Sequence, residues 1–415
     1  MRVLISGASI AGPVLAYWLR RYGFEPTVVE KAPERRKTGG HSVDLFRPAM
    51  DIVERMGVLP RIQDKNTGTE WLTLVRERGR SVEIDIGRLF HAVSDRHVEI
   101  MRDDLSEILQ DASAGDVEYV FGDSIASITQ DDGGVDVTFE RSAPRRFDVV
   151  IGADGLHSNV RRLVFGDERA FSHFVGAYLA VLTLPNYLGL RDRTIGLMEV
   201  GRMAGVYSAK HMDDARAVFL FRSARPLAYH HRDVPRQKEI LREAYQGAGW
   251  EVPRLLAELD RTPAFYFDAI TQLRMDTWSR GRVSLVGDAG YSPGPAIGGS
   301  TSLAIVGAYV LAGELAAAGG DPARAFPACE RAMRDYVQKS RAFALGAARW
   351  LVPRGRFDVW ALALIARLVT HAPRRVTRAL ANLSNTARLH DAFAIESDDA
   401  YRARAAAPAA SGAHA

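Results

Sequence analysis

A glycine-rich segment near the N-terminus has the spacing of a dinucleotide-binding loop. It reads Gly7-Ala8-Ser9-Ile10-Ala11-Gly12 and follows the apolar run Arg2–Ser6. In the Gly-x-Gly-x-x-Gly pattern the first glycine makes a tight turn, the second lets the backbone approach a pyrophosphate, and the third lets helix pack on strand. Ser9 takes the middle position, and its small side chain still permits a close approach. The loop predicts phosphates bound at the N-terminus of a helix over residues 10–22.

An acidic residue stands where such a loop needs one. Glu30 ends a predicted strand over residues 27–30. A carboxylate at this place accepts hydrogen bonds from a ribose diol and disfavours a 2′-phosphate. Strand, loop, helix and acid together have the size of a βαβ unit. The motif does not distinguish NAD from FAD, and a plain strand–turn–helix corner is the alternative interpretation.

Two further glycine-containing loops follow predicted strands later in the chain. One reads Gly152-Ala153-Asp154-Gly155, and the other begins Gly287-Asp288 and continues to Pro295, Gly298 and Gly299. Open α/β sheets bind ligands at the carboxyl ends of their strands, where both loops are expected. Taken singly, the first acid could form a turn and the second could cap a helix. The three loops together predict one cofactor site.

In this order and spacing, the three motifs resemble those of the class A flavin-dependent aromatic hydroxylases, which have the para-hydroxybenzoate hydroxylase fold. Within that group the chain is similar to the tetracycline-inactivating monooxygenases and their antibiotic-pathway relatives, over roughly residues 1–320. The resemblance implies non-covalent FAD, NADPH or NADH as co-substrate, and O2. It implies hydroxylation of an aromatic, phenolic or polyketide-like small molecule through a flavin C4a-hydroperoxide. The flavin carries the chemistry, so no protein residue is assigned as catalytic.

The resemblance also implies which residues bind the cofactors. The N-terminal loop and Glu30 hold the adenosine diphosphate end, Arg102 contacts the chain that leads to the flavin, and Lys37 is a basic residue for NADPH. A solvated basic face is the alternative for Lys37, which lies in an Arg-Arg-Lys run. The candidate set is Gly7, Ser9, Ile10, Ala11, Gly12, Glu30, Lys31, Lys37, Asp44, Arg102, Asp154, Gly155, Gly287, Asp288, Pro295, Gly298 and Gly299.

At the flavin ring, the implied contacts involve the helix that follows the third loop. Its N-terminus offers positive potential to the anionic reduced ring. Asp288 matches the acid that holds the ribityl chain, and Asp44 matches an acid near the flavin in the tetracycline-modifying relatives. The chain departs from the family because Ser300 and Ser302 take the later Gly and Asn positions of the ring loop. The tightness of that loop is therefore open.

Substrate contacts are expected from a β-rich stretch between the second and third loops. Sheet core is the alternative for every candidate. The candidates are Met198, Tyr207, Phe219, Phe221, Tyr266 and Tyr291. The pair His230-His231 has no companions at metal-ligand spacing, so no metal site is predicted.

The predicted fold is α/β, with a discontinuous Rossmann-like FAD-binding domain, an inserted β-sheet substrate domain and C-terminal helices. The FAD-binding domain takes residues 1–70, 100–170 and 280–320, and the substrate domain takes 71–99 and 171–279. Helices follow over 321–390, and residues 400–415 are expected to form a disordered tail.

Composition limits the alternatives. The chain has 415 residues and a formal net charge of +4, which is too mild to indicate nucleic acid. A single cysteine, Cys329, indicates a cytoplasmic protein without internal disulfides. Eight arginines between Arg341 and Arg378 favour exposed helix faces over a membrane surface. Two alternative functions stay open: another flavoenzyme on this fold (a reductase, oxidase or halogenase) and a non-catalytic flavin binder. The identity of the substrate and the oligomeric state also stay open.

Overall fold

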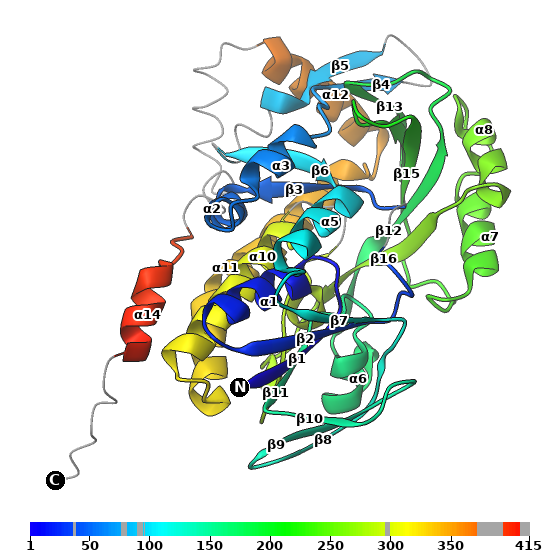
Figure 1. Cartoon of the computed structure of the whole chain (residues 1–415). Coiled ribbons are helices and arrows are strands. Elements are labelled where there is room, and N and C mark those ends of the chain that lie inside the picture. Colours follow the sequence, from blue (N-terminus) through cyan, green and yellow to red (C-terminus); the bar gives the residue numbers. More distant parts are fainter. Residues whose placement is uncertain are drawn as a thin grey trace.

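The computed structural model of the chain describes residues 1–35, 39–75, 81–88, 94, 96–294, 299–371 and 393–406. It is a mixed α/β structure with a six-stranded, mostly parallel sheet and a larger, mostly antiparallel sheet (Figure 1). The predicted fold class is confirmed.

The parallel sheet is built from segments far apart in the sequence. Its order is β17-β18-β11-β1-β2-β7, and all neighbours are parallel except β17 and β18. The central strands are apolar runs buried on both faces, as expected for a covered parallel sheet. The strands are β1 (Arg2–Ser6), β2 (Glu25–Glu30), β7 (Glu118–Phe121), β11 (Val149–Gly152), β17 (Ser279–Arg280) and β18 (Val283–Leu285).

Three helices pack around this sheet and lead to its carboxyl edge. They are α1 (Ala11–Arg21), α5 (Arg102–Ser113) and α10 (Ser300–Ala317). The last of these begins at Ser300, directly after the third glycine-containing loop. Helix α10 is long and apolar enough to cross a membrane, but 83% of it is buried inside the protein. It is therefore a core helix.

The larger sheet has seven strands in the order β16-β12-β15-β14-β13-β4-β5. Only β13 and β4 are parallel neighbours. Helices α7 (Val234–Ala244) and α8 (Val252–Ala257) cover its outer face (Figure 1). The strands are β4 (Trp71–Val75), β5 (Val82–Asp85), β12 (Ser172–Pro185), β13 (Arg193–Glu199), β14 (Arg202–Tyr207), β15 (Asp214–Arg222) and β16 (Phe265–Leu273).

Two small sheets complete the β-structure. The pair β3 (Ser42–Phe46) and β6 (His97–Met101) is antiparallel and precedes α2 (Arg47–Arg55) and α3 (Leu59–Asp64). Phe147 ends a strand of the other small sheet, and β11 of the parallel sheet begins two residues later at Val149. The other small sheet contains β8 (Ile125–Asp131), β9 (Gly134–Phe139) and β10 (Arg145–Phe147), and α6 (Asn159–Val164) follows β11.

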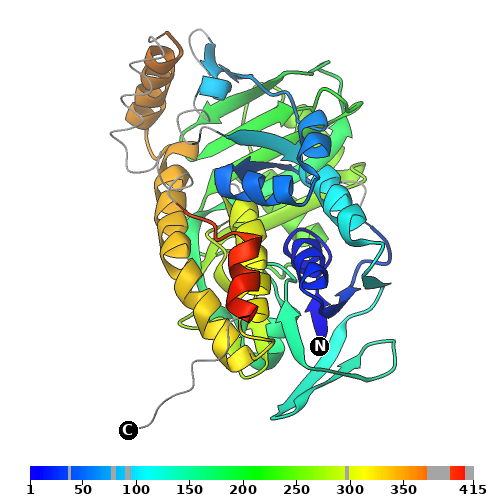
Figure 2. The ribbon, with the colours of Figure 1, turned by 60° about the vertical axis from the view of Figure 1, so that its left-hand side comes forward.

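The C-terminal part is helical within the described residues. Helices α11 (Pro322–Leu351) and α12 (Arg356–His371) precede α14 (Asp398–Ala406), which lies along α10 (Figure 2). The predicted disordered tail is wrong for residues 400–406. Tyr401 is 2% exposed and packs on Gly313, where a Cβ atom would lie 2.4 Å from its ring. Arg404 also pairs with the buried Glu314 at 2.7 Å.

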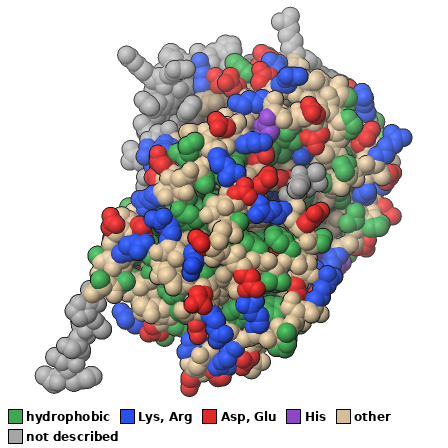
Figure 3. All heavy atoms as spheres, viewed as in Figure 1, with side chains coloured by type: hydrophobic (Ala, Val, Ile, Leu, Met, Phe, Trp, Pro, Cys, Tyr) green, Lys and Arg blue, Asp and Glu red, His purple; other side chains and the backbone are tan. Residues whose placement is uncertain are grey.

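The surface carries both signs of charge. On the face shown in Figure 3, the Lys and Arg side chains alternate with Asp and Glu. This mixture agrees with the small net charge of +4.

Candidate functional site: a cofactor cavity at the strand ends

A cavity of about 1570 Å³ lies at the carboxyl edge of the parallel sheet, facing the larger sheet. Residues of all three predicted loops line it, among them Gly7, Ser9, Asp154, Gly155 and Asp288. The structure thus brings together three motifs that are distant in the sequence. Carboxyl ends of parallel strands meet at one edge of a sheet, which explains the convergence.

The two outer glycines of the N-terminal loop are required by the packing of the turn. Gly7 has φ +107°, and a Cβ atom there would lie 2.5 Å from the Ala153 carbonyl oxygen in the second loop. A Cβ atom on Gly12 would lie 1.9 Å from the Gly7 carbonyl oxygen. The first and second loops therefore touch through backbone, and any side chain would separate them. Ile10 and Ala11 line the cavity where α1 begins.

Glu30 closes the same turn. Its carboxylate accepts hydrogen bonds from the backbone amides of Ala8, at 2.9 Å, and Ala32, at 2.8 Å. Each carboxylate oxygen has a further lone pair, so Glu30 can also accept from a ribose hydroxyl. Glu30 and the exposed Lys31 both line the cavity.

Helix α5 supports the glycine loop through three residues on one face. Arg102 donates to the Ser9 hydroxyl at 3.1 Å, Ser106 donates to the Ser9 carbonyl at 2.9 Å, and Gln110 donates to the Ala8 carbonyl at 2.6 Å. Positions four residues apart share a helix face. Sequence reasoning found only Arg102; the other two could have been found by following that spacing.

The third loop places an acid deep in the cavity. Gly287 has φ +66° and lies two residues after the end of β18, so Asp288 enters the space beside Arg102 and Tyr266. Burial raises the pKa of Asp288, and the positive charge of Arg102 partly offsets this rise. The ionised form of a buried carboxyl group is stabilised when a ligand donates hydrogen bonds to it.

His41 is a cavity residue that sequence reasoning missed. Burial and the neighbouring Arg102 lower the pKa of His41 to about 4, so its imidazole is neutral at physiological pH. Its ring lies 5.9 Å from that of Tyr266. Gly39 and Gly40, just before it, are wedged between Ala264 and Asp103. The only available signal was the glycine pair that precedes His41.

Asp154 has a structural partner at the start of helix α6. Its carboxylate accepts from the backbone amides of Asn159, at 2.9 Å, and Val160, at 3.1 Å, and from the Ser158 hydroxyl. The adjacent Gly155 has φ +80°, and nothing lies within 4 Å of the place where its Cβ would be. Gly155 therefore leaves open space where a ligand can approach the backbone.

The N-terminus of α10 points into the same cavity. Gly299 has φ +94° and precedes Ser300 and Thr301, which line the cavity. Ser302 is buried and accepts a hydrogen bond at 3.0 Å from the backbone amide of Phe46. The serine that departs from the family pattern thus ties α10 to β3. Lys37, Pro295 and Gly298 lie outside the described residues.

Asp44 is not among the residues that line the cavity. Its carboxylate bonds to His97 Nε2 at 2.8 Å on the β3–β6 pair. The neighbouring Val43 lines the cavity instead, because alternate residues of a strand point to opposite faces. We therefore leave Asp44 out of the proposed set of direct contacts.

Residues 1–345 match the sequence model of the FAD binding domain family. The uncharacterised Mycobacterium tuberculosis protein Rv1260 is 44% identical over 349 residues, which is 82% of this chain and 91% of that protein. A flavin-dependent monooxygenase of Legionella longbeachae is 39% identical and covers 83% of this chain and 88% of its own. The chain belongs to the FAD-dependent monooxygenases. The structure of the tetracycline destructase Tet(51) superposes with a TM-score of 0.79 at 34% identity, over 92% of this chain and 98% of that one.

The residues around the cavity of this monooxygenase fit FAD. The amide oxygen of Gln110 is buried and has no hydrogen-bond partner among the described residues, although the same side chain anchors the glycine loop. The open space at Gly155 and the acid of Asp288 lie along the same cavity. A dinucleotide provides hydroxyl donors and a pyrophosphate for such groups.

The structure places the six residues that were predicted to contact the substrate in different surroundings. Tyr266 lines the cavity. Phe219 and Phe221 instead belong to the core under α7 and α8, because odd-numbered residues of β15 face outward. They are therefore not cavity walls.

The other three predicted substrate residues also pack away from this cavity. Tyr207 accepts a hydrogen bond from the Ser42 amide at 2.7 Å, and burial raises its pKa to about 12. Met198 packs on a small apolar cluster of the edge strands. Tyr291 is 2% exposed and packs against Trp278, with the two rings tilted and their centres 4.5 Å apart. Each has a structural role in holding segments together.

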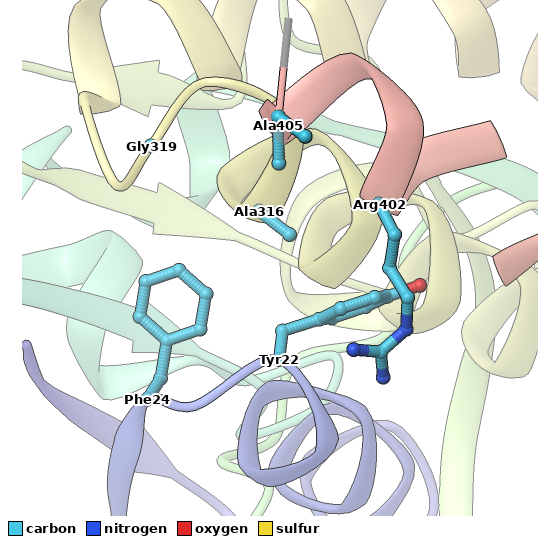
Figure 4. Close-up of a pocket in the computed structure, with 7 residues that line it drawn as sticks. Tyr22, Phe24, Ala316, Gly319, Arg402 and Ala405 are labelled. Carbon is cyan, nitrogen blue, oxygen red and sulfur yellow. The ribbon is translucent and has the colours of Figure 1, made fainter. Parts of the chain in front are cut away.

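A second cavity, of about 520 Å³, lies at the other end of α10 (Figure 4). Tyr22, Phe24 and Ala316 line it together with α14, whose Arg402 guanidinium lies 5.2 Å from the Tyr22 ring centre. None of the described residues that line it is an acid or a histidine. No set of three His, Cys, Asp or Glu residues suited to a metal is found in the part of the chain that the structure describes.

Proposed function

We propose that this monooxygenase hydroxylates an aromatic, phenolic or polyketide-like small molecule with NADPH or NADH and O2. The observation that carries the proposal is the cavity itself, where three FAD loops face Tyr266 on the inner side of a separate sheet. The similarity to Tet(51), whose name gives tetracycline as the compound it destroys, supports the substrate class.

The bound FAD supplies hydride acceptance and oxygen activation, and the protein supplies binding and exclusion of water. The glycine loop and α5 hold the adenosine end. Asp288 accepts hydrogen bonds from the chain that leads to the ring, and Gly155 permits a close approach of the ligand to the backbone. The N-terminus of α10 directs positive potential into the cavity, which favours a negative charge developing there.

The substrate side needs neutral side chains that hold a phenol by hydrogen bonds. Tyr266 offers a neutral hydroxyl, since burial raises its pKa. His41 offers a neutral imidazole that can donate or accept one hydrogen bond per nitrogen. We assign these two side chains to substrate orientation.

We assign FAD binding and substrate binding to the parts of the chain that form the two large sheets. In this proposal residues 1–70, 100–170 and 280–320 form the FAD-binding part, and residues 71–99 and 171–279 form the substrate part. A cytoplasmic location belongs to the same proposal, because the lone cysteine, Cys329, is a buried free thiol.

The decisive experiment is product labelling. The purified protein is expected to bind FAD and, with a phenolic polyketide that stimulates NAD(P)H oxidation, to place one ¹⁸O atom from ¹⁸O2 in the product. Stimulated oxidation without labelled product would indicate a reductase or an oxidase. A colourless protein that FAD cannot reconstitute would overturn the proposal.

The site assignment has its own test. Asp288→Ala removes the acceptor in the third loop, and a charge-assisted hydrogen bond contributes about 1.5–3 kcal/mol. We expect the Kd for FAD to rise at least about tenfold, measured by flavin fluorescence. Asp335→Ala, at an exposed acid of α11, is the matched control. An unchanged Kd in Asp288→Ala would show that the acid does not contact FAD.

A further inference from the structure

Strand β16 carries a buried glutamine near its carboxyl end. Gln272 is 0% exposed and lies two positions after Ile270, on the inner face of the seven-stranded sheet. Tyr266, which lines the cofactor cavity, belongs to the same face of the same strand. Burying an amide is unfavourable unless its polar atoms find hydrogen-bond partners. The partners of Gln272 therefore indicate what this residue does.

The side-chain amide of Gln272 joins three parts of the molecule. Its nitrogen donates to the Pro293 carbonyl at 3.1 Å and to the Arg341 carbonyl at 2.9 Å. Its oxygen accepts from the guanidinium group of Arg274 at 3.2 Å. An amide nitrogen has two hydrogens, so both are in use. One buried side chain thus connects the substrate-side sheet with the third loop and with α11.

The neighbouring residue reinforces this junction through its backbone. The Leu273 amide donates to the Ser292 carbonyl at 3.0 Å. The Arg341 side chain donates to the Leu273 carbonyl, so α11 and β16 each donate to a backbone carbonyl of the other. Residues 272 and 273 therefore hold the consecutive carbonyls of residues 292 and 293. Two adjacent bonds restrict the orientation of this segment as well as its position.

The segment held in this way lies between two cavity-lining parts of the third loop. Helix α9 (Asp288–Tyr291) precedes it and begins with the cavity acid Asp288. Helix α10 follows it, and Ser300 at the start of α10 also lines the cavity. Ser292 and Pro293 are themselves buried. A displacement of this segment would therefore move the acid, the helix N-terminus or both relative to a bound cofactor.

We propose that Gln272 is a positioning residue that holds the third loop against bound FAD and thereby raises the reduction potential of the flavin. The reduced ring carries a negative charge, which the N-terminus of α10 stabilises. This stabilisation falls off within about one helical turn, so it depends on where the loop holds the helix. The oxidised ring is neutral and gains little from the same terminus. The inference rests on the placement of FAD in the proposed function and on nothing that concerns the substrate.

The test compares the FAD-loaded wild type with Gln272→Met, which keeps the length of the side chain and removes both donors. The reduction potential is measured without oxygen, at equilibrium with a reference dye. At a fixed dye potential we expect the ratio of reduced to oxidised bound FAD to fall about threefold, because the helix N-terminus is held less closely to the ring. The Kd for oxidised FAD is expected to change less than about twofold, since the neutral ring gains little from that terminus.

A second measurement requires no redox chemistry. Hydrogen exchange followed by mass spectrometry reports how firmly residues 288–294 are held. We expect exchange in this segment to be at least about threefold faster in Gln272→Met than in the wild type. Exchange over the N-terminal glycine loop, residues 7–12, is expected to stay unchanged, because Gln272 does not contact that loop.

Tyr245→Phe is the matched control for the loss of a buried hydrogen bond. The Tyr245 hydroxyl donates to the Leu220 carbonyl at 2.9 Å, and its ring packs on the outer face of the same sheet. This substitution is expected to lower thermal stability and to leave both the potential and the exchange over residues 288–294 as in the wild type. Changes of the same size in both variants would refute the inference, because they would reflect a general loss of stability.

Gln272→Glu tests the donors directly. An ionised carboxylate has no hydrogen to donate, whereas a protonated carboxyl group has one. Because burial raises the pKa of a carboxyl group, we expect protonation between about pH 8 and about pH 6. Compared with Gln272→Met at the same pH, this variant should recover part of the wild-type potential at the lower pH only. Equal potentials of the two variants at both pH values would exclude a role for the donors.

Two further outcomes would overturn the inference. A wild-type potential and wild-type exchange in Gln272→Met would show that the loop is held without this amide. A Kd for oxidised FAD that rises about threefold or more would make Gln272 a residue needed for binding rather than one that sets the potential. Failure of the proposed function is distinguishable, because it appears in the wild type as absent FAD or unlabelled product, whereas here only the variants differ.

Discussion

The two faces of the seven-stranded sheet come from the same strands and differ sharply in chemistry. The outer face carries an aromatic cluster, in which Tyr178 stacks on both Phe221 and Phe267 beneath α7 and α8. The inner face carries polar and titratable groups such as Arg216 and Asp268 between apolar residues. Because successive residues of a strand alternate between faces, a shift of one residue would exchange these two environments.

The polar groups of the inner face each bind a segment from elsewhere in the chain. Arg216 donates to the Gly40 carbonyl at 3.0 Å, next to the cavity residue His41. Asp268 holds His157, which lies in the loop that follows the second glycine motif. The outer face therefore stabilises the sheet, whereas the inner face positions the cofactor loops. Substitutions on the two faces should accordingly affect different measurements.

The largest expected effect is on the outer face. Phe219→Ala removes a fully buried ring that packs edge-on against Tyr245 at 4.9 Å. Deleting a buried phenylalanine side chain costs about 3–5 kcal/mol through lost transfer energy and the cavity left behind. We expect a large drop in the thermal unfolding midpoint, measured by calorimetry. FAD affinity and turnover per folded molecule should stay unchanged.

The neighbouring residue provides the control for this substitution. Val218 lies next in the same strand, is partly exposed and faces inward. Val218→Ala should cost about 1 kcal/mol, because a smaller and less buried group is removed. If Phe219→Ala instead kept its stability and lost substrate affinity, the outer face would be the substrate surface and the assignment of faces would be reversed.

The alternation of faces also explains which parts of the site were predictable. The glycine loops could be located from the sequence, because a positive φ and a close backbone approach require glycine at fixed positions, as at Gly7. Phe219 and Phe221 were misassigned because aromatic residues suit either face, and only the position of α7 and α8 decides between them. His157 and Asp268 lie far apart in the chain, so no spacing could pair them.

Helix α14 shows a similar limit of prediction from the sequence. The alanine-rich segment after residue 400 has a composition typical of a disordered tail, and only its contacts stabilise it as a helix. Those contacts are made by Tyr401 on Gly313 and Arg404 on Glu314, in another part of the chain. A composition rule cannot include partners that are distant in sequence.

On the inner face, Asp268→Asn is expected to have an intermediate effect that depends on pH. The substitution keeps an oxygen acceptor for His157 but removes the negative charge, with an expected cost of about 1 kcal/mol at pH 7. The pKa of His157 is raised to about 10 in the folded protein. A raised folded-state pKa stabilises the protein fully below the unfolded value near 6.5, and this contribution is lost as pH rises through about 10.

Thermal unfolding of the wild type and Asp268→Asn at pH 7 and pH 10.5 tests this expectation. The difference between the two proteins should be present at pH 7 and nearly absent at pH 10.5. Asp167→Asn is the control, since Asn caps the short helix there as well as Asp does and does not contact His157. A difference that grows toward high pH would contradict the assignment of a charged His157.

The smallest effect on stability, and the most specific one on function, is expected for Tyr266→Phe. The ring stays in place beside His41, and only the hydroxyl of this cavity-lining residue is lost. Because one hydrogen bond contributes about 1 kcal/mol, we expect the KM for an aromatic substrate to rise about fivefold with an unchanged Kd for FAD. Tyr178→Phe on the outer face is the matched control: its hydroxyl accepts from the Leu227 amide at 2.7 Å, so it should lower stability and leave KM unchanged. If Tyr266→Phe lowered stability and left KM unchanged, the inner face would be a second core rather than the wall of the substrate site.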